Sequence, residues 1–323
     1  MKLLIITQKV DKDDPILGFF HGWIVEFAGH CESVVVICLE KGAKELLVNA
    51  EVLSLGKEDG ISRVKYLWRF YRHIWKERKN YDAVFVHMNP IYVVLGGLLW
   101  RMLGKKISLW YTHKNVDWKL RLAEKFTHKI FTASKESFRL SSRKVQVMGH
   151  GIDVDFFSPD TRVIPGNALL SVGRLMPTKR HDLVIEASAL VGRPLRIAGE
   201  GSLRLELENL VKKLGASVEF LGPLTQAQLR DEYRKAAFLV HTSETGSLDK
   251  VVLEALACGL RVITTSTSLS GLPIMKAHAI PKAIAEVITA TSGFDRQSLV
   301  SYVRENHSLQ NLIPKILGDM KNI

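Results

Sequence analysis

The sequence has few cysteines and no hydrophobic run long enough to cross a membrane. Its three cysteines, Cys31, Cys38 and Cys258, have a spacing that fits neither a disulfide framework nor a metal site. The longest apolar run, residues 91–100, has ten residues, whereas a transmembrane helix needs about 20. The first residues read as a strand followed by charge rather than as a signal peptide. These absences predict a reduced, cytoplasmic protein.

Acidic residues are scarce in the first half of the chain, so the positive charge is uneven. Across 323 residues, 45 Lys and Arg are set against 33 Asp and Glu, a formal net charge of +12. Residues 1–150 hold 25 basic and 15 acidic side chains, net +10, whereas residues 151–323 hold 20 and 18, net +2. The first half is therefore predicted to meet an acidic partner or a charged membrane surface.

Repeats, low-complexity stretches and long linkers are absent, and short β-branched runs alternate with longer amphipathic segments. Eleven such runs are predicted as strands, and apolar strands between helices are typical of parallel sheets covered on both faces. Because eleven strands exceed one doubly wound domain, we predict two α/β domains, residues 1–155 and 156–323, that face a central cleft. The proline-containing residues 151–166 hold the boundary, and the C-terminal stretch is helical.

Three histidines follow predicted strands of the first half, where ligands of doubly wound sheets bind. They are His87, His113 and His150, and together they indicate a polar lining. His113 is favoured, since a charged run rather than core sequence follows it.

Two cations follow the first predicted strand of the second half. Gly173 allows a tight exit, and Arg174 and Lys179 then occupy the loop that leads into a helix. A Lys in the first turn of a helix opposes the macrodipole, a placement that makes sense if an anion lies between them. As a pair, these residues favour phosphate binding over two solvated loop cations.

Two further strand ends carry candidate residues. Gly199 and Gly201 permit a close backbone approach to a ligand, although an ordinary tight turn explains them equally well. Gly246 and Ser247 open a helix on which Glu254 lies between apolar neighbours. A buried carboxylate needs a partner, and either a sugar diol or a structural salt bridge would serve.

These motifs, taken in order, resemble the nucleotide-sugar-binding domain of the group 1 (family 4) glycosyltransferases. The resemblance implies the GT-B fold, two Rossmann-like domains facing a cleft. It is strong over residues 168–266 and extends weakly to the first half through Gly18, His113 and residues 150–153. The motifs are Ser171-Val172-Gly173-Arg174 with Lys179, Ile197-Ala198-Gly199-Glu200-Gly201, Phe220-Leu221-Gly222-Pro223-Leu224, residues 252–259 and Val262-Ile263-Thr264.

The resemblance implies roles for individual residues. Arg174 and Lys179 would hold the donor diphosphate and neutralise the departing nucleoside diphosphate, and His113 would lie near the transferred sugar. Glu254 would accept hydrogen bonds from the ribose, and residues 222–224 would seat the base. The full expected donor-binding set is Gly18, Gly173, Arg174, Lys179, Gly201, Gly222, Leu224, Ser247, Leu248, Asp249, Lys250 and Glu254.

One position departs from the family pattern. The family usually has a second Glu eight residues before the position of Glu254, and here that position is Gly246. Recognition of the donor sugar must therefore differ, with Glu244 or Asp249 as replacements and Lys250 as an added cation.

The mechanism implied is transfer with retention of configuration, resting on positioning of the acceptor and stabilisation of the leaving diphosphate. Neither a metal nor another cofactor is expected, because Arg and Lys take the place of a metal and no Asp-x-Asp pair stands at a strand end. A GDP- or UDP-sugar is the expected donor, and a glycan or lipid-linked molecule the expected acceptor.

Residues 63–79 form a basic, aromatic segment. Val64, Leu67, Trp68, Tyr71, Ile74 and Trp75 fall on one helical face, with basic residues mostly on the other. Two interpretations stay open: a helix docked on the sheet with a solvated basic face, or a helix at the cytoplasmic surface of a membrane. Residues 91–103 favour a buried helix.

Three alternatives compete with the transferase. A nucleotide-sugar epimerase would keep the architecture, and a catalytically weakened relative would explain Gly246. A nucleic-acid-binding protein would suit the pI of about 9.5, but the helical spacing of Trp68, Tyr71 and Trp75 indicates core packing, so no nucleic acid is expected. The ordered motifs favour the transferase.

Overall fold

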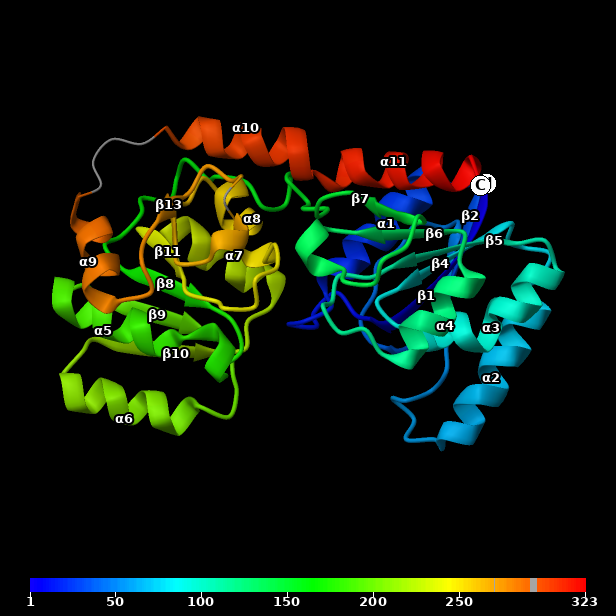
Figure 1. Cartoon of the computed structure of the whole chain (residues 1–323), viewed down its shortest axis with the longest axis horizontal. Helices are drawn as coiled ribbons and strands as arrows, with labels where there is room; N and C mark the ends of the chain where they lie inside the picture. Colours follow the sequence, from blue (N-terminus) through cyan, green and yellow to red (C-terminus); the bar gives the residue numbers. More distant parts are fainter. Residues whose placement is uncertain (270, 291–294) are drawn as a thin grey trace. The chain divides into compact units, whose positions relative to one another are not determined.

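The computed structural model describes residues 1–269, 271–290 and 295–323, which fall into two compact units (Figure 1). Unit 1 comprises Met1–Gly151 and Leu309–Ile323, and unit 2 comprises Ile152–Ser308. In each unit, helices cover both faces of a parallel sheet, as in Rossmann-like domains. The predicted α/β class with two doubly wound domains is confirmed.

Unit 1 is built on seven parallel strands. Alternate side chains of its first strand enter opposite cores: Leu3 and Ile5 face one layer of helices, and Leu4 and Ile6 face the other. Both faces are therefore buried, which explains the unbroken apolar run. In sheet order the strands are β3 (Ala50–Ser54), β2 (Ser33–Lys41), β1 (Lys2–Val10), β4 (Ala83–His87), β5 (Lys106–Trp110), β6 (Lys129–Thr132) and β7 (Val145–Val147).

The helices of unit 1 divide between these two faces. The helices α1 (Phe19–His30) and α11 (Leu309–Lys321) bury their apolar residues in one core. The helices α2 (Arg63–Lys76), α3 (Pro90–Met102) and α4 (Trp118–Phe126) contribute to the other. A short 3-10 turn, η1 (Lys135–Ser137), follows β6.

Unit 2 repeats the arrangement with six parallel strands, and its strand order reverses between β8 and β11. In sheet order the strands are β10 (Val218–Gly222), β9 (Leu195–Ala198), β8 (Leu169–Val172), β11 (Phe238–His241), β12 (Val262–Thr264) and β13 (Met275–Lys276). One face is covered by α5 (His181–Val191), α6 (Arg204–Leu214) and α9 (Pro281–Ala290), the other by α7 (Gln226–Lys235), α8 (Lys250–Ala257) and α10 (Arg296–His307). The 3-10 turns are η2 (Pro177–Lys179) and η3 (Thr267–Leu269).

The last helix differs from the predicted division into residues 1–155 and 156–323. The chain passes from unit 1 to unit 2 after Gly151, but α11 returns to unit 1. The helix α11 lies beside α1 (Figure 1). Its residues Leu309, Leu312, Ile313 and Ile316 are buried in the same core as α1. The helical periodicity of this stretch was visible in the sequence, but the period does not identify the core that buries the apolar face.

All eleven predicted strands are present, and two edge strands, β3 and β13, were missed. β3 has one buried residue, Val52, and β13 is two residues long. Edge strands face solvent on one side, so they carry a weaker apolar signal. No helix among the described residues has the length and hydropathy needed to cross a membrane.

Candidate functional site

The strand exits of unit 2 are built from glycines that approach each other closely. The Gly173 N–H donates to the Ala198 carbonyl at 2.9 Å, and the Gly199 N–H donates to the Gly222 carbonyl at 2.8 Å. Gly199 has φ +139°, and a Cβ there would lie 2.0 Å from the Gly173 carbonyl oxygen. A Cβ at Gly201 would lie 2.3 Å from the Leu175 carbonyl oxygen. The packing of neighbouring strand exits therefore requires glycine at these positions, whether or not a ligand binds there.

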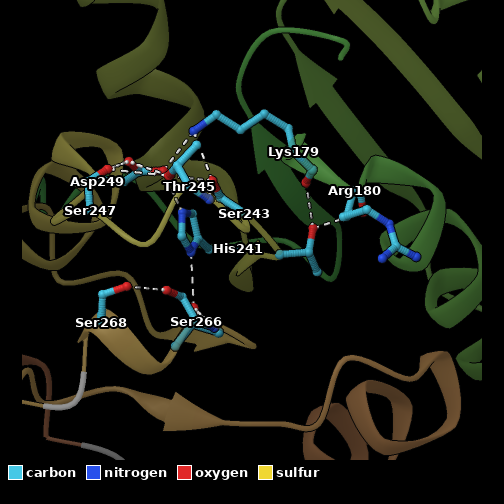
Figure 2. Close-up of polar contacts among 11 residues, drawn as sticks. Lys179, Arg180, His241, Ser243, Thr245, Ser247, Asp249, Ser266 and Ser268 are labelled. Atoms are coloured by element: carbon cyan, nitrogen blue, oxygen red, sulfur yellow. Dashed lines mark hydrogen bonds and ion pairs between the residues drawn. The ribbon is translucent and has the colours of Figure 1, made fainter. Parts of the chain in front are cut away.

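Lys179 and Asp249 meet at the point where the strand order reverses, the place where doubly wound sheets bind ligands. Lys179 follows β8 and Asp249 follows β11, and Lys179 Nζ lies 2.7 Å from Asp249 Oδ2 (Figure 2). The same oxygen accepts from His241 Nε2 at 2.9 Å. His241 is in turn fixed through Nδ1, which lies 3.0 Å from Thr264 Oγ1.

Hydroxyl groups complete this arrangement. Asp249 Oδ1 accepts hydrogen bonds from Ser247 at 3.1 Å and from Thr245 at 3.4 Å, and Lys179 Nζ donates to Ser243 at 3.2 Å (Figure 2). We call these side chains the Lys179 cluster. Its members are Lys179, His241, Ser243, Thr245, Ser247 and Asp249.

The loop that carries Lys179 is anchored to the loop after β11. Thr242 Oγ1 donates to the Lys179 and Arg180 carbonyl oxygens, each at 2.9 Å, and the Glu244 N–H donates to the Thr178 carbonyl at 2.9 Å. Arg180 has φ +51° and caps α5. The two loops therefore hold each other in place and position the Lys179 side chain at the strand ends.

The electrostatics of the cluster keep Asp249 ionised. Burial alone would raise the pKa of Asp249, but the hydrogen bond with His241 and the charge of Lys179 outweigh it and hold the pKa well below its usual range. Next to the cluster, burial lowers the pKa of His181 to about 4, so this imidazole is neutral at pH 7 beside Ser171. The cluster thus contains an ionised carboxylate next to the Lys179 side chain.

Gly246 adopts a conformation that disfavours the glutamate usual in the family. Its φ is +61°, in the left-handed region that costs a side-chain residue about 1–2 kcal/mol. Of the two acidic replacements considered, Asp249 turns into the Lys179 cluster, whereas Glu244 pairs with Arg180 at 2.8 Å. Asp249 is therefore the acidic side chain of this loop that lies in the Lys179 cluster.

Glu254 has an internal partner. Its side chain is 1 % exposed, lies 2.8 Å from Lys250 Nζ one helical turn away, and accepts from the Tyr233 hydroxyl at 3.1 Å. The sequence left two partners open for Glu254, a sugar diol or a structural salt bridge, and the structure contains the salt bridge. Lys250, predicted as an added cation for the donor, serves this pair.

The remaining predicted donor residues of unit 2 occupy strand exits and loops. Arg174 is exposed directly after β8, with no side-chain hydrogen bond found in the described part of the chain. Gly222 ends β10 with φ +70°, and Leu224 and Leu248 pack against the core that contains α8. Arg174 is thus accessible to an anionic ligand, whereas the two leucines are partly structural.

Among the predicted residues of unit 1, His87 and Gly18 are buried and His113 is exposed. His87 is buried at 2 % exposure, stacks on Phe20 at 3.8 Å, and lies 3.2 Å from Thr7 Oγ1, so it belongs to the core rather than to a polar lining. His113 is exposed, and its Nδ1 accepts from the Asn115 N–H at 3.1 Å. At Gly18, a Cβ would lie 2.5 Å from the Asp14 carbonyl oxygen, so local packing explains why a glycine occupies this position.

His241 was missed as a site residue. It lies inside a predicted strand, so its sequence context indicates a core residue. In the structure its side chain is 5 % exposed. The signal was a histidine two residues before the Ser243–Gly246 loop, in a strand otherwise apolar. Across the described ranges, no group of three or more His, Cys, Asp and Glu side chains is arranged to hold a metal ion.

Comparison with known proteins gives this geometry a context. Residues 161–280 match the family model "Glycosyl transferases group 1". D-inositol 3-phosphate glycosyltransferase of Mycolicibacterium smegmatis is 32% identical over 160 residues, 44% of this chain and 36% of that protein. The enzyme of the same name from Streptomyces bingchenggensis is 33% identical over 159 residues, 40% and 34% of the two chains. The matches thus span about a third of the length of these relatives.

Solved structures agree over the whole chain. Anabaena HepE in complex with UDP superposes with a TM-score of 0.78 at 15% identity, covering 100% of both chains. The galactosyltransferase WaaB of the lipopolysaccharide outer core gives 0.65 at 17% identity, covering 99% of both. At such identities the likeness establishes the GT-B fold.

Proposed function

Since residues 161–280 belong to the group 1 glycosyltransferases, we propose that this protein transfers a sugar from a nucleoside diphosphate sugar to an acceptor. The observation that carries the proposal is the Lys179 cluster, a fixed ammonium group at the reversal of strand order in a segment that matches the family. A diphosphate needs such a cation, and the exposed guanidinium of Arg174 follows the same strand.

The donor is a UDP- or GDP-sugar. HepE, whose fold this chain shares, has been crystallised with UDP and with UDP-glucose, which supports the uridine nucleotide. In unit 2, Lys179 and Arg174 bind the diphosphate, and the backbone at Ser247 and Asp249 faces the phosphate or the sugar. Because Glu254 is already paired with Lys250, binding of the ribose requires this pair to accept a further hydrogen bond or to open.

Transfer proceeds with retention of configuration and without a metal or other cofactor. Arg174 and Lys179 stabilise the charge that develops on the leaving nucleoside diphosphate. No covalent nucleophile is assigned, and the remaining catalysis is positioning of the acceptor hydroxyl. His113 lies near the transferred sugar, and Gly18 allows close approach of donor or acceptor.

The acceptor is a glycan or a lipid-linked molecule, and the protein acts in the cytoplasm at the inner face of a membrane. The excess of basic residues in residues 1–150 supports an acidic acceptor or an anionic surface on this side of the molecule. Neither the fold nor the family match favours an epimerase or a nucleic-acid-binding protein.

A thermal-shift panel of nucleoside diphosphates and nucleotide sugars tests the donor class. A ligand present at about 100 times its dissociation constant stabilises the native state by about 2.7 kcal/mol. We expect UDP or GDP, but not the matching monophosphate, to raise the melting temperature. If none of these compounds raises it, nucleotide-sugar transfer is refuted.

The variant Arg174→Ala tests the catalytic assignment. We expect turnover to fall by about 10²- to 10³-fold, because one group that stabilises the transition state is lost. Arg162→Ala is the matched control, since Arg162 is 89% exposed and pairs with Asp160, a near neighbour in the sequence. Equal turnover of the two variants would remove Arg174 from the mechanism.

A further inference from the structure

Most of the predicted apolar face of α2 is exposed, although the helix is docked on unit 1. Phe70 and Ile74 are its buried residues, while Trp68 and Trp75 are 60% and 52% exposed. These partly exposed tryptophans lie in a contiguous apolar patch, which marks an interaction surface. The exposed apolar side chains of α2 are Val64, Leu67, Trp68, Tyr71 and Trp75.

The apolar surface continues onto α3. The Tyr71 hydroxyl donates to the Leu95 carbonyl at 3.0 Å, so the two helices lie side by side (Figure 1). Leu98 and Met102, three and seven residues beyond Leu95, share its helix face and are 61% and 76% exposed. We call the exposed apolar side chains of α2 with Leu98 and Met102 the α2–α3 face.

Positive charge borders this face. The helix α2 contains five Lys and Arg and no acidic residue. The guanidinium group of Arg72 lies 5.2 Å from the centre of the Trp68 ring, and that of Arg78 lies 4.3 Å from the Trp75 ring. Aromatic rings beside cations suit the headgroup region of an anionic membrane, where the rings enter the apolar boundary and the cations meet phosphate.

A crevice opens between these helices at the carboxyl ends of β2, β3 and β4. Its volume is about 410 Å³, within the range of small-molecule sites. Leu39, Leu55, Leu67, Phe70 and Leu95 are among its lining residues, and its polar side chains are Arg63, Asn89 and the two tyrosines Tyr66 and Tyr92. A sugar or a nucleotide would leave most of its hydroxyls without partners there, whereas an apolar chain would not.

We infer that unit 1 binds an anionic lipid surface through the α2–α3 face and that the crevice holds the apolar chain of a lipid-linked acceptor, with Arg63 near its phosphate. This inference rests on the proposed function, whose acceptor it specifies. The charge and the apolar lining together favour an anionic lipid over a second copy of this chain, because two copies would bring their basic α2 helices together.

Co-sedimentation of the full chain with vesicles tests the surface. We expect binding to vesicles of phosphatidylcholine mixed with phosphatidylglycerol, and much weaker binding to phosphatidylcholine alone. Each cation near an anionic surface contributes about a five-fold factor, so Arg72→Gln with Lys76→Gln should weaken binding about 30-fold. Trp68→Ser with Trp75→Ser should weaken it by at least ten-fold.

Trp118→Ser is the matched control, because Trp118 is 62% exposed but lies on α4. It should leave binding unchanged. Equal loss in this variant, or no binding of the wild-type chain to anionic vesicles at low salt, overturns the inference. If light scattering instead shows a dimer that Trp68→Ser with Trp75→Ser separates, the face is a self-association surface and the inference is wrong.

The crevice is tested with farnesyl phosphate below its micelle concentration and with inorganic phosphate as the control. We expect only farnesyl phosphate to raise the melting temperature, and Leu67→Glu, at a 41% exposed position lining the crevice, to abolish the shift. An equal shift with inorganic phosphate, or an undiminished shift in Leu67→Glu, refutes the crevice assignment.

These measurements need no donor and no catalysis, so the two proposals fail separately. Vesicle binding without a nucleotide-dependent thermal shift would refute the transferase and leave the lipid surface. Sugar transfer to a water-soluble acceptor without vesicle binding would refute the lipid surface and leave the transferase.

Discussion

Replacing Asp249 by asparagine should destabilise unit 2 by about 3 kcal/mol at pH 7. The substitution keeps the size of the side chain but removes the charge that Lys179 and His241 bind. Breaking a buried ion pair by neutralising one partner costs about 3–5 kcal/mol. The lower end applies, because Asp249 and Lys179 keep 14% and 18% exposure and water partly replaces the lost interaction.

The size of this effect should depend on pH in a defined direction. The pKa of Asp249 in the folded chain lies well below its value of about 3.9 in an unfolded chain. The carboxylate therefore contributes its full stability above the unfolded pKa and loses it as pH falls through the folded pKa. The difference between wild type and Asp249→Asn should be constant from about pH 5 to pH 8 and shrink below about pH 4.

Urea unfolding followed by two signals separates the units. All six tryptophans, at positions 23, 68, 75, 100, 110 and 118, belong to unit 1, so tryptophan fluorescence follows that unit. Hydrogen exchange of β11 and α8 follows unit 2. We expect the variant to lower protection there and to leave the fluorescence transition unchanged.

Asp155→Asn supplies the control, because Asp155 forms an exposed pair with Arg304 in the same unit. Its effect should be a small fraction of that of Asp249→Asn. A loss of stability in Asp249→Asn that stays the same between pH 7 and pH 3, or no loss at all, would refute the assignment of Asp249 as the ionised centre of the Lys179 cluster.

Three further outcomes are expected. Gly199→Ala should lower the free energy of unfolding by at least about 2 kcal/mol, because its Cβ would collide with the Gly173 carbonyl. Gly215→Ala is the control and should cost about 1 kcal/mol, since Gly215 has φ +62° in open space. Equal losses of the two variants in urea unfolding would contradict the close approach of the strand exits. Glu254→Gln should cost about 3 kcal/mol by the same measurement, because it removes one charge of a buried ion pair, and a neutral result would show that the pair is not formed. The native chain should resist a thiol reagent at pH 8, since all three cysteines are buried and burial raises the pKa of Cys38 and Cys258 to about 12. Mass spectrometry should find labelling only in denaturant, and labelling of Cys258 in the native chain would contradict its packing.

The α/β class and the position of Arg174 and Lys179 after a strand could be inferred from the residues alone. Short apolar runs between amphipathic segments fit strands buried on both faces, because each face of a parallel sheet is covered by helices. Arg174 and Lys179 follow such a run directly, so their location at a strand exit is a local property of the chain. The resemblance over residues 168–266 likewise rests on contiguous motifs, and the family match covers that segment.

Local sequence patterns do not identify interacting side chains that lie far apart in the sequence. Lys179 and Asp249 are 70 residues apart, and nothing in either segment specifies that their side chains meet. His241 has the sequence context of a core histidine, and only its two neighbours, Asp249 and Thr264, make it part of the cluster. The same holds for the hydrogen bond from the Tyr233 hydroxyl to Glu254, since these two side chains are 21 residues apart.

Helical periodicity defined faces but not what covers them. The apolar stripe of residues 63–75 was compatible with a docked helix, yet the sheet accommodates only Phe70 and Ile74 and leaves the tryptophans in solvent. The stripe of α11 had an equally clear period, and it is buried in unit 1 rather than in the unit that precedes it in sequence. A sequence specifies the apolar side of a helix locally, whereas burial depends on which surfaces the rest of the chain brings against it, and this is a property of the folded structure.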